Sequence, residues 1–446
     1  GNFNGGDLRV GNGGTLTLSG SLSNSSISVA NKATFTQQAA GAIAGEAAGV
    51  TCLGTATLAG ANSYGGETVI GAAGISNIVL NANHNRALGS TAGGTTVVGG
   101  TPLNFENKLV LGNGVTITGE TLTLASANGR AGLRYNSAGT GMWDGDIVFT
   151  GGMNYLGSDN GSGTLVIGST SDDTVTGADQ GVSVRGGGTV IINSTLNLGT
   201  GTLMRDDSGT LLLNTATTNI GNTSVVQGTL KWGVSEALPA NRTLSVGKGP
   251  AAANATLDLN GKNQTVAGVA DQHYAAGTGT QRILSATPAT LTVSNNADNT
   301  FGKVGSVIEG QVSLVKAGTG MLTLTGTNTT SGAVTVLGGT LTVGAAGTLG
   351  TGTNVAVEAG TLALQTSGGI ADDATVRIAD GGGAKVELAA GVNETVAHLC
   401  FGEKSKPAGT YGATGSGADF VNDEHFSGSG VLTVMRGSGG TLIQVR

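Results

Sequence analysis

Charged and aromatic side chains are scarce in this chain. Of its 446 residues, 11% are charged and 3% aromatic, and there are only 5 prolines and 2 cysteines. Ordinary globular domains are about 25% charged, so a typical enzyme composition is excluded. Disorder is disfavoured because 38% of the residues are hydrophobic, and collagen is excluded because the 82 glycines follow no triplet period. We therefore expect a folded, repetitive chain that is rich in turns.

Basic runs and long apolar stretches are also missing. The formal net charge is -7, so the positive surface that grips phosphates is lacking and nucleic acid is not expected as a partner. No stretch approaches about 18 uninterrupted apolar residues, so we expect no membrane span. No signal-peptide pattern opens the chain, and Gly1 stands where an initiator methionine would, which favours the mature form of an exported protein.

The signatures of common catalytic and metal sites do not occur. The sequence contains no Gly-x-Ser-x-Gly elbow, no His-Glu-x-x-His and no Walker loop, and its 4 histidines are scattered. Cys52 and Cys400 fit neither a disulfide framework nor a metal site, so we expect both to be small core residues. We predict no catalytic residue, no metal and no cofactor.

Adjacent acidic residues are the remaining hint of chemistry, because a carboxylate pair can bind Ca²⁺ or hydrolyse a glycoside. Neighbouring residues on a strand point to opposite faces, so side-by-side acids are expected in turns instead. The pairs are Asp172-Asp173, Asp206-Asp207, Asp372-Asp373 and Asp423-Glu424.

Short segments bordered by glycine recur along the chain. The tripeptide Gly-Thr-Leu usually opens a run that alternates apolar and polar residues, as in "GGTLTLSG" and "GGTLTVG", and each run predicts a short strand. The spacings from Gly209 to Gly228 and from Gly320 to Gly339 indicate a period of about 20 residues.

Longer repeats support this period. "LMRDDSGTLLLNTATTNIGNTSVVQGTLKWG" from Leu203 and "LVKAGTGMLTLTGTNTTSGAVTVLGGTLTVG" from Leu314 align without a gap, and "GTATLAGANSYGGETVI" from Gly54 is a degenerate third copy. The pattern predicts an all-β chain, a parallel β-solenoid with about 20 residues per coil, in which stacked coils cover inward Leu, Val and Ile. A Greek-key sandwich of short strands is the alternative.

The segment that begins at Leu314, together with "GANSYGGETVI", resembles the passenger-associated transport repeats of bacterial autotransporters. "KPAGTYGATGSGADFVNDEHFSGSGVLTV", from Lys406 to Val434, is similar to the C-terminal segment of large surface proteins with autotransporter-associated repeats. The resemblance implies a right-handed parallel β-helix that is exported to the cell surface or the extracellular space. Its motif is built from Gly, Thr, Leu and Asn, so it says little about chemistry.

The predicted domain organisation has two parts. Residues 1–396 are expected to form the β-solenoid, with irregular insertions around residues 130–160 and 265–285. Residues 397–446 are expected to form a C-terminal solenoid segment with a terminal strand at 441–446. In the second insertion, the pair His273-Tyr274 reads as a loop rather than a site.

One segment concentrates residue types that bind sugars. "LRYNSAGTGMWDGDIVFTGGMNY" brings aromatic rings and carboxylates together, a common arrangement for gripping glycans. The candidate contacts are Tyr135, Trp143, Asp144, Asp146 and Tyr155. The alternative is that Trp143 packs a corner or fills a widened coil.

The two ends of the sequence match each other. After the hinge of "GSGGTLIQVR", the residues from Gly440 to the end and those before Gly14 of a second copy would together complete one coil of about 20 residues. Unsealed strand edges recruit other chains, and a head-to-tail contact that does not close gives a fibre. The predicted subunit contacts are Thr441, Leu442, Ile443, Val445, Leu8 and Val10.

Three functions follow from these patterns. The first is a non-enzymatic extracellular structural protein whose subunits assemble head to tail into a cell-surface filament, so the chain's partner is itself. The second is a monomeric autotransporter-type passenger adhesin that binds glycans or proteins of a host or neighbouring cell. The third is a β-helical enzyme that acts on polysaccharide.

Overall fold

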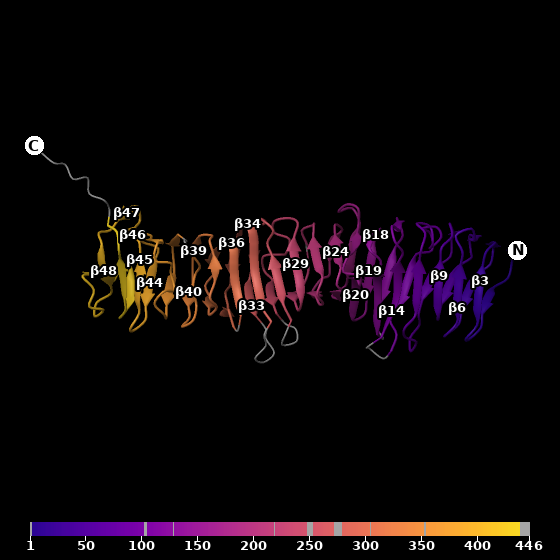
Figure 1. The fold of residues 1–446 in the computed structure, drawn as a ribbon, viewed down its shortest axis with the longest axis horizontal. Helices are drawn as coiled ribbons and strands as arrows, with labels where there is room; N and C mark the ends of the chain where they lie inside the picture. Colours follow the sequence, from indigo (N-terminus) through magenta and orange to yellow (C-terminus); the bar gives the residue numbers. More distant parts are fainter. Residues whose placement is uncertain are drawn as a thin grey trace, which may run out of the picture. The chain divides into compact units, whose positions relative to one another are not determined.

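The three-dimensional structure is a computed structural model, which describes residues 2–101, 105–127, 129–217, 219–247, 253–271, 279–303, 305–351 and 354–437. Within these ranges the chain is all-β, and parallel strands stack as a β-solenoid of about 16 turns with about 23 residues per turn (Figure 1). The predicted fold class is confirmed. The right-handed sense that the resemblance implies stays a prediction.

The coil is longer than the predicted period because coil length varies along the chain. Val79 of one coil pairs with Lys108 of the next, whereas Thr210 pairs with Thr229, so these two coils are about 29 and about 19 residues long. The repeats that reveal the period lie in short coils, and corner loops lengthen the others. No helix in the described ranges is long and apolar enough to cross a membrane.

The chain divides into two compact units. Unit 1 comprises residues 1–224 and 228–233, and unit 2 comprises residues 225–227 and 234–446. The predicted division at residue 396 therefore lies inside unit 2. The segment around 130–160, for which an irregular insertion is predicted, contains strands between Arg130 and Ser158. Part of the other predicted insertion, including His273-Tyr274, lies outside the described residues.

Unit 1 has four columns of strands, and two of them, the one that ends at β10 (Ser63–Tyr64) and the one that begins at β15 (Thr116–Thr118), follow the same side of the coil. The first two are β1 (Phe3–Asn4), β4 (Ser21–Ser23), β7 (Ala42–Gly45) and β10 (Ser63–Tyr64), and then β2 (Leu8–Val10), β5 (Ile27–Val29), β8 (Val50–Cys52), β11 (Thr68–Ile70), β13 (Thr95–Val98), β16 (Leu122–Ala125), β19 (Ile147–Thr150), β22 (Thr174–Gly177) and β25 (Thr195–Asn197).

The other two columns of unit 1 contain its longest strands. They are β3 (Thr15–Leu18), β6 (Thr34–Gln37), β9 (Thr55–Leu58), β12 (Val79–Ala82), β14 (Glu106–Leu111), β17 (Arg130–Tyr135), β20 (Met153–Ser158), β23 (Gly181–Arg185) and β26 (Leu203–Arg205), and then β15 (Thr116–Thr118), β18 (Gly139–Asp144), β21 (Gly163–Ile167), β24 (Thr189–Ile192), β27 (Thr210–Leu213) and β29 (Gly228–Trp232). The strand β28 (Thr223–Val225) lies where the two units divide.

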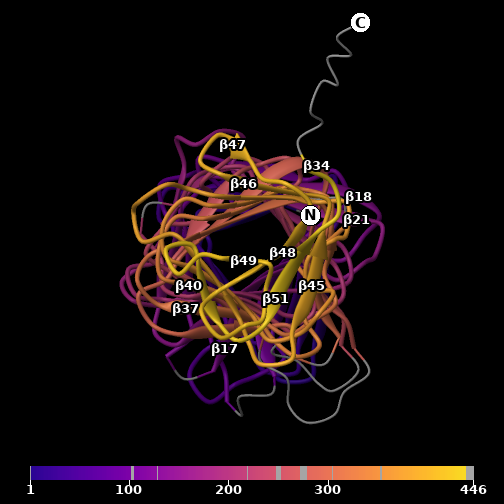
Figure 2. The ribbon, with the colours of Figure 1, turned by 90° about the vertical axis from the view of Figure 1, so that its left-hand side faces the viewer.

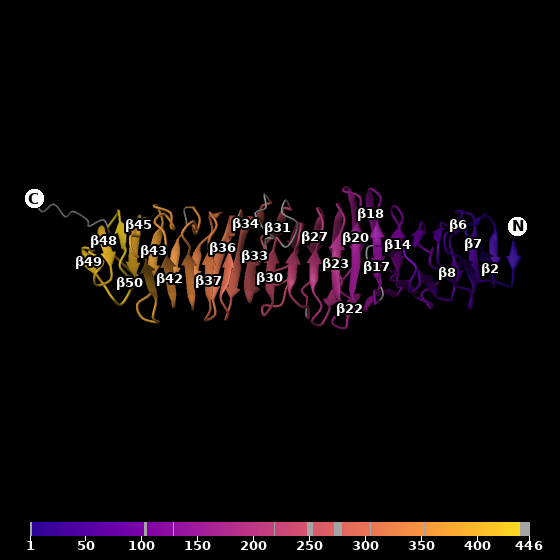
Figure 3. The same ribbon diagram turned by 90° about the horizontal axis from the view of Figure 1, so that it is seen from below.

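Most strands of unit 2 also pair in parallel (Figure 3). One sheet holds β31 (Ala255–Asp258), β34 (Gln281–Ser294), β36 (Ser306–Ala317), β39 (Val334–Val336), β41 (Val355–Val357), β43 (Thr375–Ile378), β46 (His398–Phe401) and β47 (Lys404–Ser405), with β32 (Gln264–Val266) and β38 (Thr329–Thr330) beside it. The remaining strands are β30 (Thr243–Val246), β33 (Gly268–Asp271), β35 (Asn299–Phe301), β37 (Met321–Leu324), β40 (Thr340–Val343), β42 (Thr361–Leu364), β44 (Lys385–Leu388), β50 (Phe426–Gly428), β45 (Asn393–Val396), β51 (Val431–Val434), β48 (Gly409–Gly412) and β49 (Phe420–Val421).

The core is a set of apolar ladders inside the coil. In each ladder, residues at the same register position of successive strands point inward and are covered by the coils on either side. One ladder of fully buried side chains in unit 1 is Phe35, Ala56, Leu80, Leu109, Leu133, Leu156 and Val184. Burying a Leu or Val side chain is worth about 1.5–3 kcal/mol, so these ladders supply the main favourable term.

The parallel pattern changes near the end of unit 2. β47 pairs antiparallel with β46, and β48 pairs antiparallel with β51. In the end view of Figure 2, β48 and β49 lie over the middle of the coil rather than along its wall. The segment from 397 onward was predicted to continue the solenoid, so its antiparallel strands are a feature that the repeat pattern did not reveal.

Candidate functional site

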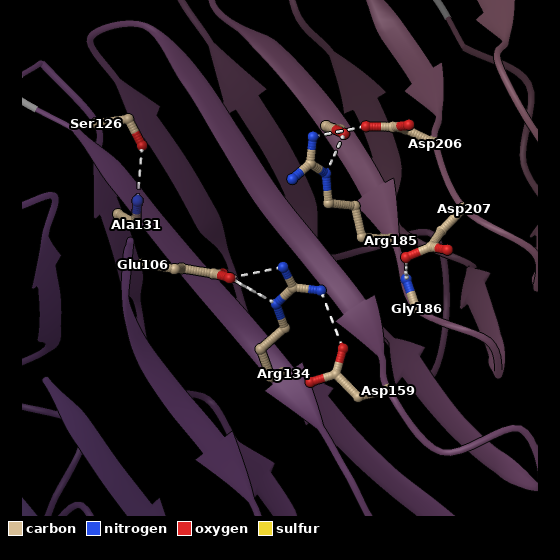
Figure 4. A network of polar contacts seen from close by, with 10 residues as sticks. Glu106, Ser126, Ala131, Arg134, Asp159, Arg185, Gly186, Asp206 and Asp207 are labelled. Atoms are coloured by element: carbon tan, nitrogen blue, oxygen red, sulfur yellow. Dashed lines mark hydrogen bonds and ion pairs between the residues drawn. The ribbon is translucent and has the colours of Figure 1, made fainter. Parts of the chain in front are cut away.

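The strongest concentration of charge contacts in unit 1 lies on the outer face of β14, β17, β20 and β23 (Figure 4). Alternate residues of these strands point outward, and parallel pairing brings outward positions of successive coils side by side. Arg134 is the register partner of Gly157, and Gly157 is the partner of Arg185. We call the residues Glu106, Arg134, Asp159, Arg185 and Asp206 the charged face.

Arg134 joins three successive coils. Its Nη2 donates to Glu106 Oε2 at 2.6 Å and its Nε donates to Glu106 Oε1 at 2.9 Å, while Nη1 donates to Asp159 Oδ1 at 3.2 Å. Its side chain is only 7% exposed. Burial alone would lower the pKa of Arg134, but the carboxylates of Glu106 and Asp159 outweigh that effect and raise the pKa. The guanidinium therefore stays charged.

Two glycines make room for this cluster. A Cβ atom at Gly132 would lie 1.7 Å from Glu106 Oε1, and one at Gly157 would lie 2.2 Å from Arg134 Nη1. Both contacts are shorter than any real Cβ contact, so a side chain at either position would displace the end of Glu106 or of Arg134. The guanidinium and the carboxylate lie flat on the sheet because of this.

The charged face continues across the next coils. Arg185 donates from Nη2 to Asp206 Oδ2 at 2.6 Å, and Asp207 accepts from the backbone N–H of Gly186 at 3.3 Å. The Tyr155 ring lies between two guanidiniums, with Arg185 Cζ at 4.8 Å and Arg130 Cζ at 5.3 Å from its centroid. Each contact links one coil to another, so the arrangement stabilises the stack.

The charged face does not resemble a hydrolytic site, because each carboxylate named above accepts a hydrogen bond from an arginine or a backbone N–H. No group of three or more His, Cys, Asp and Glu side chains that could hold a metal ion occurs in the part of the chain that the structure describes. Three of the acidic pairs, Asp172-Asp173, Asp372-Asp373 and Asp423-Glu424, fall in turns or bends, which confirms the turn interpretation for them.

The predicted glycan contacts do not form one exposed surface. Tyr135 and Trp143 are fully buried, and Tyr155 is 7% exposed. The Tyr135 hydroxyl donates to Ala138 O at 2.8 Å. The alternative for Trp143 therefore applies, because its indole fills the interior of the coil. Among the candidate contacts, only Asp144 and Asp146 reach the surface appreciably, where they accept hydrogen bonds from Ser169 and Thr174.

The remaining predicted residues are divided between described and undescribed parts of the chain. Leu8 and Val10 lie on β2, in the first coil, where Val10 is buried and Leu8 is half-buried. Thr441, Leu442, Ile443 and Val445 lie outside the described residues. Cys52 is buried, and burial raises the pKa of its thiol to about 11, so the reactive thiolate is suppressed. Cys400 is half-buried and free.

Polar groups inside the coil were missed at the sequence level. Arg205 and Lys316 occupy the same position of the two long repeats and are both fully buried. Arg205 donates to the carbonyls of Val184, Gly186 and Gly209, and Lys316 donates to those of Ala317, Gly318 and Gly338. The gapless alignment of the two repeats could have revealed this pair, because both repeats place a cationic residue at the same position of an otherwise apolar strand.

Two buried asparagines, Asn62 and Asn328, make the same pair of contacts with neighbouring coils. Asn62 accepts from Ile43 N–H in the preceding coil and donates to Ala87 O in the following one, at 2.9 and 2.7 Å. Asn328 does the same with Ile308 and Thr348, at 2.8 and 2.6 Å. Each side chain therefore satisfies backbone groups where the ladder is irregular.

Comparisons with known proteins agree with this fold. The Passenger-associated-transport-repeat family matches residues 53–75 and 314–343, which contain the two asparagines. The chain is 26% identical over 410 residues to "Adhesin BmaC autotransporter" of Brucella suis biovar 1 (strain 1330), an alignment that covers 78% of this chain and 11% of that protein. The chain thus spans about a tenth of the relative's length. No solved structure matches the chain.

The repeat and the relative indicate a location at the cell surface or outside the cell. Together with the stacked parallel strands, they fit an autotransporter passenger-type β-helix that carries passenger-associated transport repeats.

Proposed function

We propose that the chain is a non-enzymatic, adhesin-type passenger segment that presents a β-solenoid surface to another cell. The observation that supports this function best is the parallel solenoid with passenger-associated transport repeats, together with the similarity to an autotransporter adhesin. A stack of short coils suits this role because its backbone hydrogen bonds and apolar ladders hold a long outer surface without large loops. The expected partners are glycans or proteins of a host or neighbouring cell.

The non-enzymatic part of the proposal is supported by the charged face. Its carboxylates are engaged with arginines or backbone N–H groups, and glycoside hydrolysis requires two carboxyl groups that flank a substrate.

Surface display tests the proposal. Residues 1–446 are fused to a heterologous translocator and displayed on a non-adherent bacterium, and adherence to cultured epithelial cells is counted against the translocator alone. We expect adherence to rise and to be blocked by the purified chain. Equal adherence of both strains, with display verified by antibody, would contradict the proposal.

Head-to-tail assembly is a second candidate, which the first coil supports. Leu8, Leu16 and Leu18 point inward but are only half-buried, whereas their register partners Ile27, Phe35 and Gln37 are fully buried. Such an edge can accept a further strand, and the predicted donor is the segment Thr441 to Arg446.

Electron microscopy of the purified chain tests this second candidate. We expect fibres from the full chain and none after deletion of Thr441 to Arg446. Single particles in both preparations would rule out assembly through this strand and leave the adhesin proposal standing.

A further inference from the structure

One column of strands in unit 1 is interrupted. The four-stranded sheet ends at β10, and β15 begins another sheet with no strand on its N-terminal side. In the coil between them, the chain turns from the end of β12 to the start of β13 without forming a strand. This turn takes the place of the missing strand, because Ser90 N–H donates to Tyr64 O at 2.8 Å and Asn85 Oδ1 accepts from Thr116 N–H at 3.0 Å.

The interruption leaves a cleft of about 370 Å³ between the turn and β15. Its lining combines hydroxyl side chains, one amide and two groups of opposite charge over a buried apolar floor. The lining residues include Asn85, Arg86, Leu88, Thr116, Ile117 and Glu120. This is the volume range of small-molecule sites, at its lower end.

Glu120 is the distinctive group of the cleft. It is 3% exposed, and its Oε1 accepts a hydrogen bond from Thr95 Oγ1 at 2.9 Å. Arg86 lines the same cleft and is exposed. Among the residues that the structure describes, neither side chain forms an ion pair. A buried carboxyl group and an arginine thus share one cleft without neutralising each other.

The walls of the cleft are held in place before any ligand arrives. Asn62 donates from its backbone N–H to Arg86 O at 3.0 Å and from its side chain to Ala87 O at 2.7 Å, which fixes the turn. On the other wall, β15 pairs with β18 from Thr116 to Thr118. A site whose walls are fixed loses little entropy on binding.

We propose that this cleft binds a single neutral hexopyranose ring, with Glu120 accepting hydrogen bonds from its hydroxyls and Arg86 donating to them. Sugar hydroxyls both donate and accept, so one ring can satisfy the carboxyl group, the guanidinium and the hydroxyl side chains together. An anionic ligand is disfavoured by Glu120. A peptide strand is disfavoured because the free edge of β15 is only 3 residues long. This inference rests on the proposed function and names a ligand for it.

Saturation-transfer NMR on the full chain, with methyl glucoside, methyl mannoside and methyl galactoside as probes, tests the proposal. We expect at least one probe to bind. Glu120→Gln should weaken that binding about tenfold, because it replaces one acceptor oxygen of the carboxyl group by an amide NH2 group that cannot accept from a sugar hydroxyl, and Arg86→Ala should weaken it as well, because it removes a donor.

Glu67→Gln is the matched control. Glu67 accepts from Thr96 Oγ1 at 2.6 Å, next along β13 from the threonine that binds Glu120, but its bond is exposed and it does not line this cleft. It should leave sugar binding unchanged. Circular dichroism checks that each variant is folded, and Arg86→Ala, an exposed position, keeps the test informative if Glu120→Gln unfolds.

Failure of this site is distinguishable from failure of the adhesin function. Absence of binding by all three sugars, or equal binding by the folded Glu120→Gln, Arg86→Ala and unmodified chains, would overturn the cleft proposal. If displayed cells adhere in any of these cases, the adhesin function stands without this site.

Discussion

Individual buried polar residues bind backbone carbonyls at the corners of the coil. Arg205 and Lys316 lie at equivalent repeat positions, and each donates to three backbone carbonyls. Burial lowers the pKa of both groups. Because corner carbonyls turn away from the strand ladder, they need donors from side chains, and a long cation can reach several of them at once.

Removal of the Lys316 ammonium should therefore destabilise the chain. We expect Lys316→Met to lower the free energy of unfolding by about 2 kcal/mol or more, because buried carbonyls lose their donor at about 1–3 kcal/mol each. Urea unfolding followed by circular dichroism measures the change. Lys303→Met, at an exposed position, is the control and should stay within about 0.5 kcal/mol of the unmodified chain. Equal stability of both variants would show that Lys316 does not hold the corner.

Glu120 should make stability depend on pH. Desolvation by burial raises its pKa from 4.5 to about 7, although the hydrogen bond from Thr95 opposes the shift. The folded chain therefore keeps a proton that the unfolded chain has lost between these values. The resulting stabilisation is complete below pH 4.5 and disappears as the pH rises to about 7, over a range of up to about 3 kcal/mol.

Comparison of unfolding free energies at pH 4.5 and 7.5 for the unmodified chain and Glu120→Gln isolates this contribution. The unmodified chain should lose more stability than the Glu120→Gln variant over this interval. If Glu120→Gln showed the same pH dependence as the unmodified chain, Glu120 would titrate at its ordinary value in the folded chain.

At the scale of strands, glycines on the outer face permit the charged face to lie flat. Arg134 lies over Gly157, and Glu106 lies over Gly132, so neither glycine is a turn residue. The sequence pattern predicted the strands here poorly, because these glycines and the arginines break the apolar alternation and read as an irregular insertion. Parallel pairing with long neighbouring strands overrides that local signal.

Gly157→Ala should cost more stability than Gly132→Ala. A Cβ at Gly157 meets Arg134 Nη1 at 2.2 Å and the Arg185 backbone carbonyl at 2.8 Å, whereas the nearest atom at Gly132 is the end of the flexible Glu106 side chain. We expect a loss of about 1–3 kcal/mol for Gly157→Ala in urea unfolding. Gly11→Ala, with no atom within 4 Å, is the control. Equal stability of all three variants would contradict the packing described for Arg134.

At the scale of the whole molecule, the repeat period was the informative signal. The spacing of Gly-Thr-Leu predicted stacked parallel strands and inward Leu and Val, and the structure has both. The candidate glycan residues illustrate the limit of such prediction. A sequence shows that Trp143 and Tyr135 lie near carboxylates, but only the coil path shows that both rings point inward.

The cleft at Glu120 could not be predicted for a related reason. It exists because one coil lacks a strand between β10 and β15, and no local pattern marks a missing ladder step. Glu120 itself lies outside the strands, between β15 and β16, where an acidic residue reads as an ordinary solvated turn.

Disulfide trapping tests the stacked coil most directly. In a chain with Cys52 and Cys400 replaced by alanine, cysteines are placed at Thr36 and Thr57, which are register partners on adjacent strands. Adjacent parallel strands lie about 4.8 Å apart, within disulfide reach. Thr36 paired with Asn81 is the control, because Asn81 is the partner of Thr57 and lies one coil further on. Under mild oxidation we predict a disulfide for the first pair and none for the second; the reverse, or no disulfide in either folded chain, would contradict the parallel stack.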